Sequence, residues 1–162
     1  MPTADNLSPK SDLWDFAVDL YTQPSVAPAC LYLQDDWSTN VNLLLFARWL
    51  ETRQLRLGAT ELQAALGRIG DWDSRYVQAL RQLRRQMKQD FAENLMQIAN
   101  VREQIKRAEL LAERQELLWL EELAEDWTQC ESVAAGDNLS FYLNYLKVTE
   151  TDIAAAHTAL VK

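Results

Sequence analysis

The chain has 162 residues, of which 48% are hydrophobic, with only 4 glycines and 4 prolines. This length suits one domain with a sizeable core, and the many leucine, alanine, glutamate, glutamine and arginine residues favour helices, because straight-chain side chains lose little rotamer freedom there. The net charge of −8 argues against general binding to nucleic acid or to an anionic membrane, since both need a basic surface. Runs of alternating β-branched residues, which a sheet requires, are missing, so we predict an all-α fold.

The charge is unevenly distributed along this acidic protein. Residues 1–58 carry 7 acids and 4 bases, residues 59–107 carry 6 and 9, and residues 108–162 carry 11 and 3. The middle of the chain is therefore basic, and the segment that follows it is strongly acidic.

The first ten residues, MPTADNLSPK, are polar and contain no apolar core of a signal peptide. We expect residues 1–10 to be a disordered tail and residues 11–162 to form a single domain. No apolar run is long enough to span a membrane. Cys30 and Cys130 are too few for a disulfide framework or a zinc site, so we expect a cytoplasmic protein.

The segment from Val41 to Leu50, VNLLLFARWL, is apolar on nearly every side. A helix without a polar face is normally covered by other helices, so we predict a helical bundle around this buried central helix. Ser38 or Thr39 would cap it, and Gly58 would end it. Two shorter helices are expected before it, over about 11–21 and 24–36.

The longest predicted helix runs from about residue 95 to residue 127 without glycine or proline. Before it, Thr60 opens a short helix that Gly70 closes, and Asp71 starts another helix that breaks near 89–94. The helix from Asp71 is about half as long as the one after it, so the two would form an uneven hairpin. We expect the far part of the long helix to pack on helices from either end of the chain. Two more short helices follow, near 139–146 and 149–160.

A dense basic cluster lies on one face of the helix that begins at Asp71, and it consists of Arg81, Arg84, Arg85 and Lys88. Guanidinium groups bind carboxylates and phosphates through two parallel hydrogen bonds, so the cluster is a candidate site for an anion or a partner. The alternative is a solvated face whose positive charges balance the acidic residues of the long helix. The acidic segment 113–126 is a second candidate contact surface.

A second candidate region surrounds the polar connection QDDWST before the central helix. Its candidate binding residues are Gln34, Asp35, Trp37, Asn42 and Arg48. We expect Trp37 to be exposed, and a pocket, if one exists, to lie here. The structural alternative makes Asn42 the partner of a Thr39 cap and pairs Arg48 with Asp35 or Asp15.

The third candidate site is an acidic row on the first helix, formed by Asp12, Asp15 and Asp19. Carboxylates one turn apart on one face can share Mg²⁺, although acids in a first helical turn also serve the helix dipole. His157 is the only histidine and lies near the C-terminus, so we expect no Ser–His or Cys–His catalytic arrangement. Phosphate-loop, dinucleotide-binding and HExxH motifs are missing, and no cofactor is predicted.

Several stretches together resemble a small proteobacterial family described only as a domain of unknown function. They are DLWDFAVDLY at 12–21, ACLYLQDD at 29–36, VNLLLFARWL at 41–50 and LRQLRRQMK at 80–88. The resemblance covers the chain from Asp12 to about Trp127. It implies a compact bacterial cytoplasmic helical protein, and it implies no activity, catalytic residue or cofactor.

We therefore expect a non-enzymatic protein-interaction or regulatory module with an unknown protein partner, and the sequence leaves the oligomeric state open. The alternative is a small helical enzyme or sensor that binds an anionic ligand, a phosphate or diphosphate, with Mg²⁺ held by Asp15 and Asp19.

Overall fold

The computed structural model describes residues 11–91, 95–130 and 132–161, so the predicted tail 1–10 lies outside the described residues. All regular structure in these three ranges is helical, which confirms the all-α prediction. No helix within them has the length and apolar character that crossing a bilayer requires. The chain divides into two compact units, one of Met1–Arg56 with Thr128–Lys162 and one of Leu57–Trp127. A single domain over 11–162 stays a prediction.

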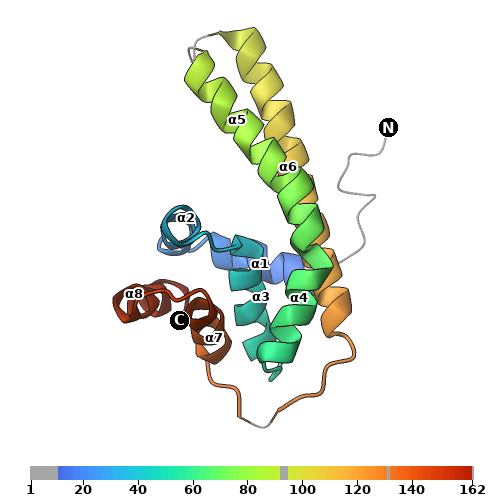
Figure 1. Cartoon of the computed structure of the whole chain (residues 1–162), viewed down its shortest axis with the longest axis vertical. Helices are drawn as coiled ribbons and strands as arrows, with labels where there is room; N and C mark the ends of the chain where they lie inside the picture. The colour runs from blue at the N-terminus through green and yellow to red at the C-terminus, as the bar shows by residue number, and fades with distance from the viewer. Residues whose placement is uncertain (1–10, 92–94, 131, 162) are drawn as a thin grey trace. The chain divides into compact units, whose positions relative to one another are not determined.

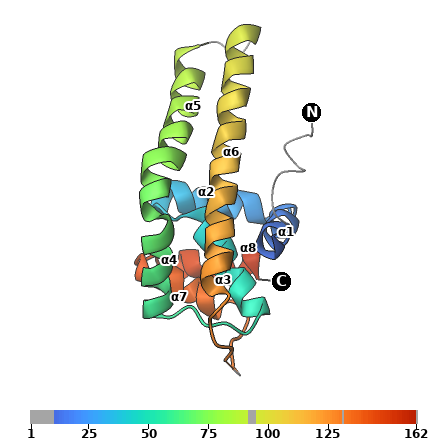
Figure 2. The ribbon, with the colours of Figure 1, turned by 90° about the vertical axis from the view of Figure 1, so that its right-hand side faces the viewer.

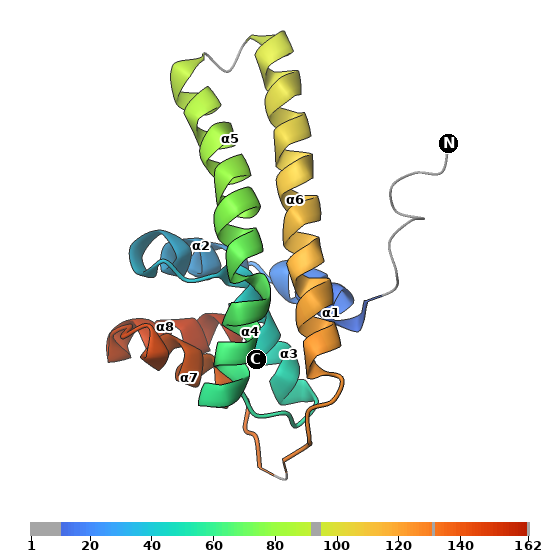
Figure 3. The same cartoon turned by 45° about the vertical axis from the view of Figure 1, so that its right-hand side comes forward.

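The first unit is built around a buried helix. It contains α1 (Asp12–Tyr21), α2 (Val26–Trp37), α3 (Val41–Thr52), α7 (Asp137–Tyr145) and α8 (Glu150–Leu160). Helix α3 packs against α1, α2 and α7, while α8 packs against α2 and α7 (Figure 3). Every residue of α3 from Asn42 to Glu51 is buried, which confirms the predicted central helix.

The ends of α3 differ from the prediction. Asn40, rather than Ser38 or Thr39, caps the helix, because its side-chain oxygen accepts the N–H of Leu43 at 3.2 Å. The helix ends at Thr52, before Gly58, and the left-handed residue that turns the chain is Gln54, with φ 57°. Glycine is the usual residue there, but it is not the only one that adopts this conformation.

The second unit is a helical hairpin. Its first arm runs without a gap through α4 (Ala59–Trp72), the π-helix η2 (Asp73–Val77) and α5 (Gln78–Asp90). Its second arm, α6 (Met96–Ala124), lies beside all three (Figures 1 and 2). The long helix and the hairpin are therefore confirmed, and the predicted break lies partly in residues 92–94, outside the described ones.

The arms are closer in length than the sequence predicted. Gly70 was expected to end a helix, but it lies inside α4, and it lacks the positive φ of a glycine that terminates a helix. Helix α5 alone has 13 residues against 29 in α6, so that part of the hairpin is uneven as predicted. Helix α4 and η2 extend the first arm, however, and both pack against α6. The packing of the far part of α6 on helices from the chain ends stays a prediction.

Aromatic side chains join the two arms near η2. The indole of Trp72 donates a hydrogen bond to the carbonyl of Ala112 at 3.0 Å. Its ring meets that of Trp119 edge-on at 5.2 Å and that of Tyr76 at 4.9 Å, and Arg68 stacks over Trp119 at 4.3 Å. Such contacts add to the burial of apolar surface, so this cluster fixes η2 on α6.

Candidate interaction surface on the hairpin

The basic cluster predicted at 81–88 lies on α5, and two of its members bind α6. Arg81 donates hydrogen bonds to Glu109 at 3.0 Å and to Glu113 at 2.6 Å. Arg84 holds both oxygens of Glu109, at 2.6 and 3.1 Å. This fork-to-carboxylate geometry is the strong, oriented form of the ion pair. Arg81 and Arg84 therefore join the hairpin arms, as the structural alternative expected.

The ion pairs shift the ionisation of their members. Burial would raise the pKa of Glu109, but the hydrogen bonds from Arg84 and Arg81 outweigh it, and the pKa of this carboxyl is lowered. Burial would likewise lower the pKa of Arg81, but its bonds to Glu109 and Glu113 raise it. Glu109 is consequently a carboxylate at neutral pH, although its side chain is only 6% exposed.

The other two members of the cluster, Arg85 and Lys88, are exposed. Helix α6 adds exposed Lys106 and Arg107 and half-buried Arg102 to the same end of the hairpin. Residues 78–107 together carry seven basic and three acidic side chains, a net of +4 in a chain of −8. The basic part of the protein is thus concentrated on the outer half of the hairpin, where α5 buries no residue.

The candidate residues around QDDWST differ in burial and in the contacts that they make. Trp37 was expected to be exposed, but it is half-buried, and its indole donates to Asp152 of α8 at 3.0 Å. Asn42 is buried on α3, Gln34 is half-buried and Asp35 is exposed, both on α2. Asp152 also accepts a hydrogen bond from Tyr32 at 3.3 Å. The region therefore joins α2 to α8.

Arg48 pairs with Glu51, and not with Asp35 or Asp15 as predicted. Its Nε also donates to the carbonyl of Leu160, at the last turn of α8, at 3.1 Å. The Glu51 carboxylate accepts three backbone N–H groups at the start of α7, from Gly136, Asn138 and Leu139, at 2.8 to 3.1 Å. A cation at a helix C-terminus and an anion at an N-terminus both match the helix dipole. This buried pair therefore fixes the ends of α7 and α8.

Sequence reasoning missed Glu51 because an acid in the last turn of a helix resembles an ordinary solvated residue. A signal was present in the spacing: Arg48 and Glu51 are three residues apart on a helix with no polar face. A charged pair on such a helix must be satisfied inside the protein.

The three aspartates of the acidic row differ in their surroundings. Asp12 bonds to Arg53 and accepts the indole N–H of Trp49 at 2.9 Å. The hydrogen bond from Arg53, then that from Trp49, lowers the pKa of Asp12. Asp15 and Asp19 are exposed. Across the described ranges, no group of three or more histidine, cysteine, aspartate or glutamate side chains is placed to hold a metal ion.

One pair resembles catalytic chemistry. The hydroxyl of Ser140 on α7 lies 2.5 Å from Nε2 of His157 on α8. Gly136 sits against the imidazole with φ 93°, and a Cβ at that position would collide with the ring. The backbone N–H groups that begin α7 already bind Glu51, so they are not available to stabilise an oxyanion. We assign the pair to packing between α7 and α8.

Comparison with known proteins gives one relationship. Neither the curated proteins nor the solved structures contain a match to the chain. A family model described as "Protein of unknown function (DUF2390)" matches residues 12–120, from the start of α1 into the last part of α6. Helices α7 and α8, which Arg48 and Glu51 fix to α3, follow the matched range. Since the match spans well over half of the sequence, the chain belongs to this family.

Proposed function

We propose that the protein is a non-enzymatic interaction module that binds an acidic partner protein through a basic patch on the outer half of the hairpin. We define this patch as Arg85, Lys88, Lys106 and Arg107. The observation that carries the proposal is that all four patch side chains are exposed on a segment, residues 78–113, that keeps seven bases against five acids in a chain of −8 when Glu109 and Glu113 are included. Charge of one sign gathered on one surface steers association with a partner of the opposite sign.

Other uses of the same charge are less well supported. The remainder of the chain is strongly negative, which opposes approach to nucleic acid or to an anionic bilayer. The alternative of an anionic ligand with Mg²⁺ depends on Asp15 and Asp19, which are exposed and belong to no group of three or more metal-ligating side chains in the described ranges. A thermal-shift screen with Mg²⁺ and diphosphates tests that alternative, since a ligand at about 100-fold its Kd adds roughly 2.7 kcal/mol to stability.

The test of the proposal compares two variants with the same change in net charge. In one, Arg85→Gln and Lys88→Gln remove two patch charges; in the control, Gln23→Glu and Asn144→Asp add two negative charges to the exposed surface of the first unit. Arg84 is left intact, because it joins the hairpin arms. Each protein is used to capture partners from cells of the native host at several salt concentrations.

We expect one specific acidic protein to bind the wild type and the control, and to bind the patch variant at least about tenfold more weakly, with affinity that falls as salt rises. Circular dichroism should show unchanged helix content in all three proteins. Equal binding by the patch variant, or binding that is insensitive to salt, would contradict the proposal.

A further inference from the structure

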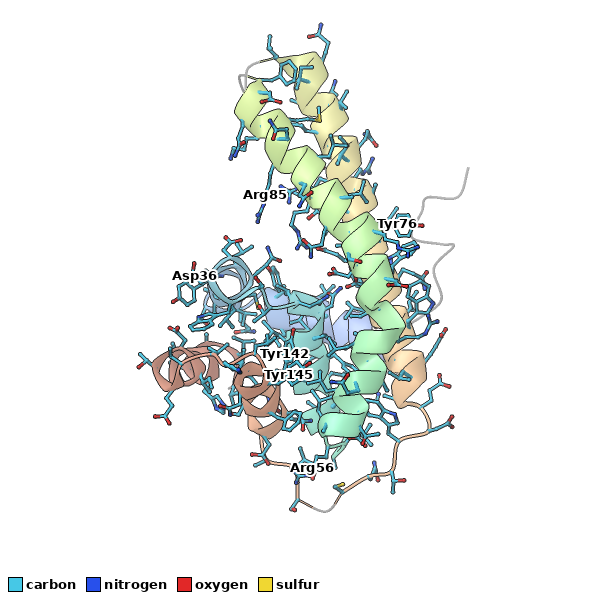
Figure 4. All side chains as sticks on the ribbon, viewed as in Figure 1. Asp36, Arg56, Tyr76, Arg85, Tyr142 and Tyr145 are labelled. Atoms are coloured by element: carbon cyan, nitrogen blue, oxygen red, sulfur yellow. The ribbon has the colours of Figure 1, made fainter. Side chains whose placement is uncertain are left out.

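The two broad sides of the hairpin differ in chemistry. One side carries the basic cluster and its glutamates, and the other carries the aromatic cluster at η2. Arg85 and Tyr76, which mark these sides, extend from opposite sides of the hairpin in Figure 4. The proposed function uses only the basic side, which leaves the second side to be explained.

Leu83 and Val101 extend the aromatic side toward the tip. At about 100° per residue, Leu83 lies roughly 100° around α5 from Arg84. By the same count Val101 lies roughly 80° around α6 from Glu109. Arg84 and Glu109 face each other across the two antiparallel arms, so they give a common reference direction for both helices. From that direction, the rotation to Leu83 on α5 and the rotation to Val101 on α6 both lead to the side opposite the basic cluster. We call Tyr76, Leu83, Val101 and Ala108 the apolar face.

Within the hairpin itself, the apolar face is uncovered. Tyr76 is 51% exposed, and Leu83 and Val101 are each 49% exposed. At its lower end it continues into half-buried Trp72 and Trp119. Single exposed apolar residues are ordinary, but a row shared by two packed helices indicates an interface.

The charge of this face indicates what covers it. By the same helical count, its flanking residues are Gln86 and Asp90 on α5 and Gln97 and Gln104 on α6. Gln86 donates a hydrogen bond to Asp90, the one acid among them, at 2.8 Å. No lysine or arginine of α5 or of residues 96–108 falls on this side, and Arg68 of α4 stacks over Trp119 below the face. The basic side would repel a copy of itself, whereas an apolar face bordered by amides can meet an identical surface without repulsion.

We propose that the apolar face binds the same face of a second copy, so that two hairpins form a four-helix bundle around a two-fold axis. Two packed helices cover only one stripe of each other, and a second pair supplies the missing cover in the way that four-helix bundles do. A two-fold interface is self-complementary, so one surface on each chain suffices. The dimer leaves the basic patch of each copy facing outward for the acidic partner.

The test is the mass of the purified full-length chain in solution. Sedimentation equilibrium and light scattering are measured from about 1 to about 300 µM, a range that covers weak dimers. We expect the wild type to approach twice 18.6 kDa as concentration rises. Leu83→Glu with Val101→Glu should raise the dimer Kd by roughly 100-fold or more, because two charges would enter an apolar contact.

The matched control adds the same two charges to α5 away from the apolar face, as Gln82→Glu with Gln89→Glu. It should dimerise as the wild type does. Leu83→Gln with Val101→Gln provides a milder pair if the glutamate pair loses helix content. A wild type that stays at 18.6 kDa throughout, as it would if a different protein covers the face, overturns the proposal. So does a folded Leu83 and Val101 variant that dimerises normally. Neither result depends on the basic patch.

Discussion

The two units use the same chemical pair, arginine with glutamate, in opposite ways. In the first unit Arg48 and Glu51 are neighbours on one helix, and they point outward from α3 to the ends of α7 and α8. In the second unit Arg81 and Arg84 meet Glu109 across two helices, with the arginines partly in contact with solvent. The pair in the first unit is buried and bonds to backbone groups, so removing it leaves a buried charge and helix ends without partners. The ion pairs in the second unit join side chains only, and water can form part of the hydrogen bonds that a substitution removes.

The largest effect that follows from this contrast is expected for Glu51→Gln. The substitution leaves the buried Arg48 without its carboxylate and weakens the cap on α7, so we expect the free energy of unfolding to fall by roughly 3–5 kcal/mol. Urea unfolding monitored by circular dichroism measures it. Replacing both charges, with Arg48→Met and Glu51→Leu, should recover only part of the loss, because the N–H groups of α7 remain without an acceptor. Full recovery would show that the capping bonds contribute little.

A smaller effect is expected for Glu109→Gln in the hairpin. Three charge-assisted hydrogen bonds from two arginines are weakened, but both arginines keep access to water, so we expect a loss of roughly 1–3 kcal/mol. At high salt, the difference in stability between the wild type and Glu109→Gln should become smaller. The difference between the wild type and Glu51→Gln should persist, because buried charges are screened less. Equal salt sensitivity of the two variants would contradict the comparison.

The same variant has a definite pH dependence. The pKa of Glu109 is lowered in the folded protein, so the unfolded chain takes up the proton first as pH falls. The stability from its ion pairs is fully present above the ordinary pKa of a glutamate and is lost as pH falls through the lowered value. The difference between wild type and Glu109→Gln should therefore shrink from pH 7 toward pH about 3.

The smallest effect is expected at Asp12. Its bond to Arg53 is exposed, and such pairs contribute little once solvent screening is included. We expect Asp12→Asn to change the free energy of unfolding by no more than about 0.5 kcal/mol, since the amide oxygen can still accept the Trp49 N–H. A loss of stability as large as that of Glu109→Gln would show that the burial of an ion pair does not determine how much the pair contributes to stability.

The parts of the fold that the sequence predicted were those with a strong local pattern. The burial of α3 followed from its missing polar face, and the long α6 followed from a stretch without glycine or proline. Gly70 was mistaken for a helix end, because glycine permits termination without requiring it. The role of Glu51 depended on residues more than eighty positions away, which no local window contains.

The candidate sites were predicted less well than the helices. The basic cluster was found as four residues, but its division into Arg81 and Arg84, bound to α6, and exposed Arg85 and Lys88 required the helix pairing. Trp37 was placed in solvent because its sequence neighbours are polar, while its partner Asp152 lies on α8. Patterns within one helix identify which side chains share a face, and the tertiary contacts decide which of them remain on the surface.

The π-helix η2 sets which chemistry each side of the hairpin displays. A π-turn holds about one residue more than an α-turn, so it changes the rotation of everything that follows by about 100°. Deleting one residue from Asp73–Val77 would let a regular α-helix continue with α5 in its present rotation, whereas keeping all five residues as regular α-helix would turn α5 by about 100°. The arginines would then leave Glu109, and Leu83 would leave the side of Tyr76. The hairpin's two-faced surface thus depends on the wider turn with which η2 takes up one extra residue.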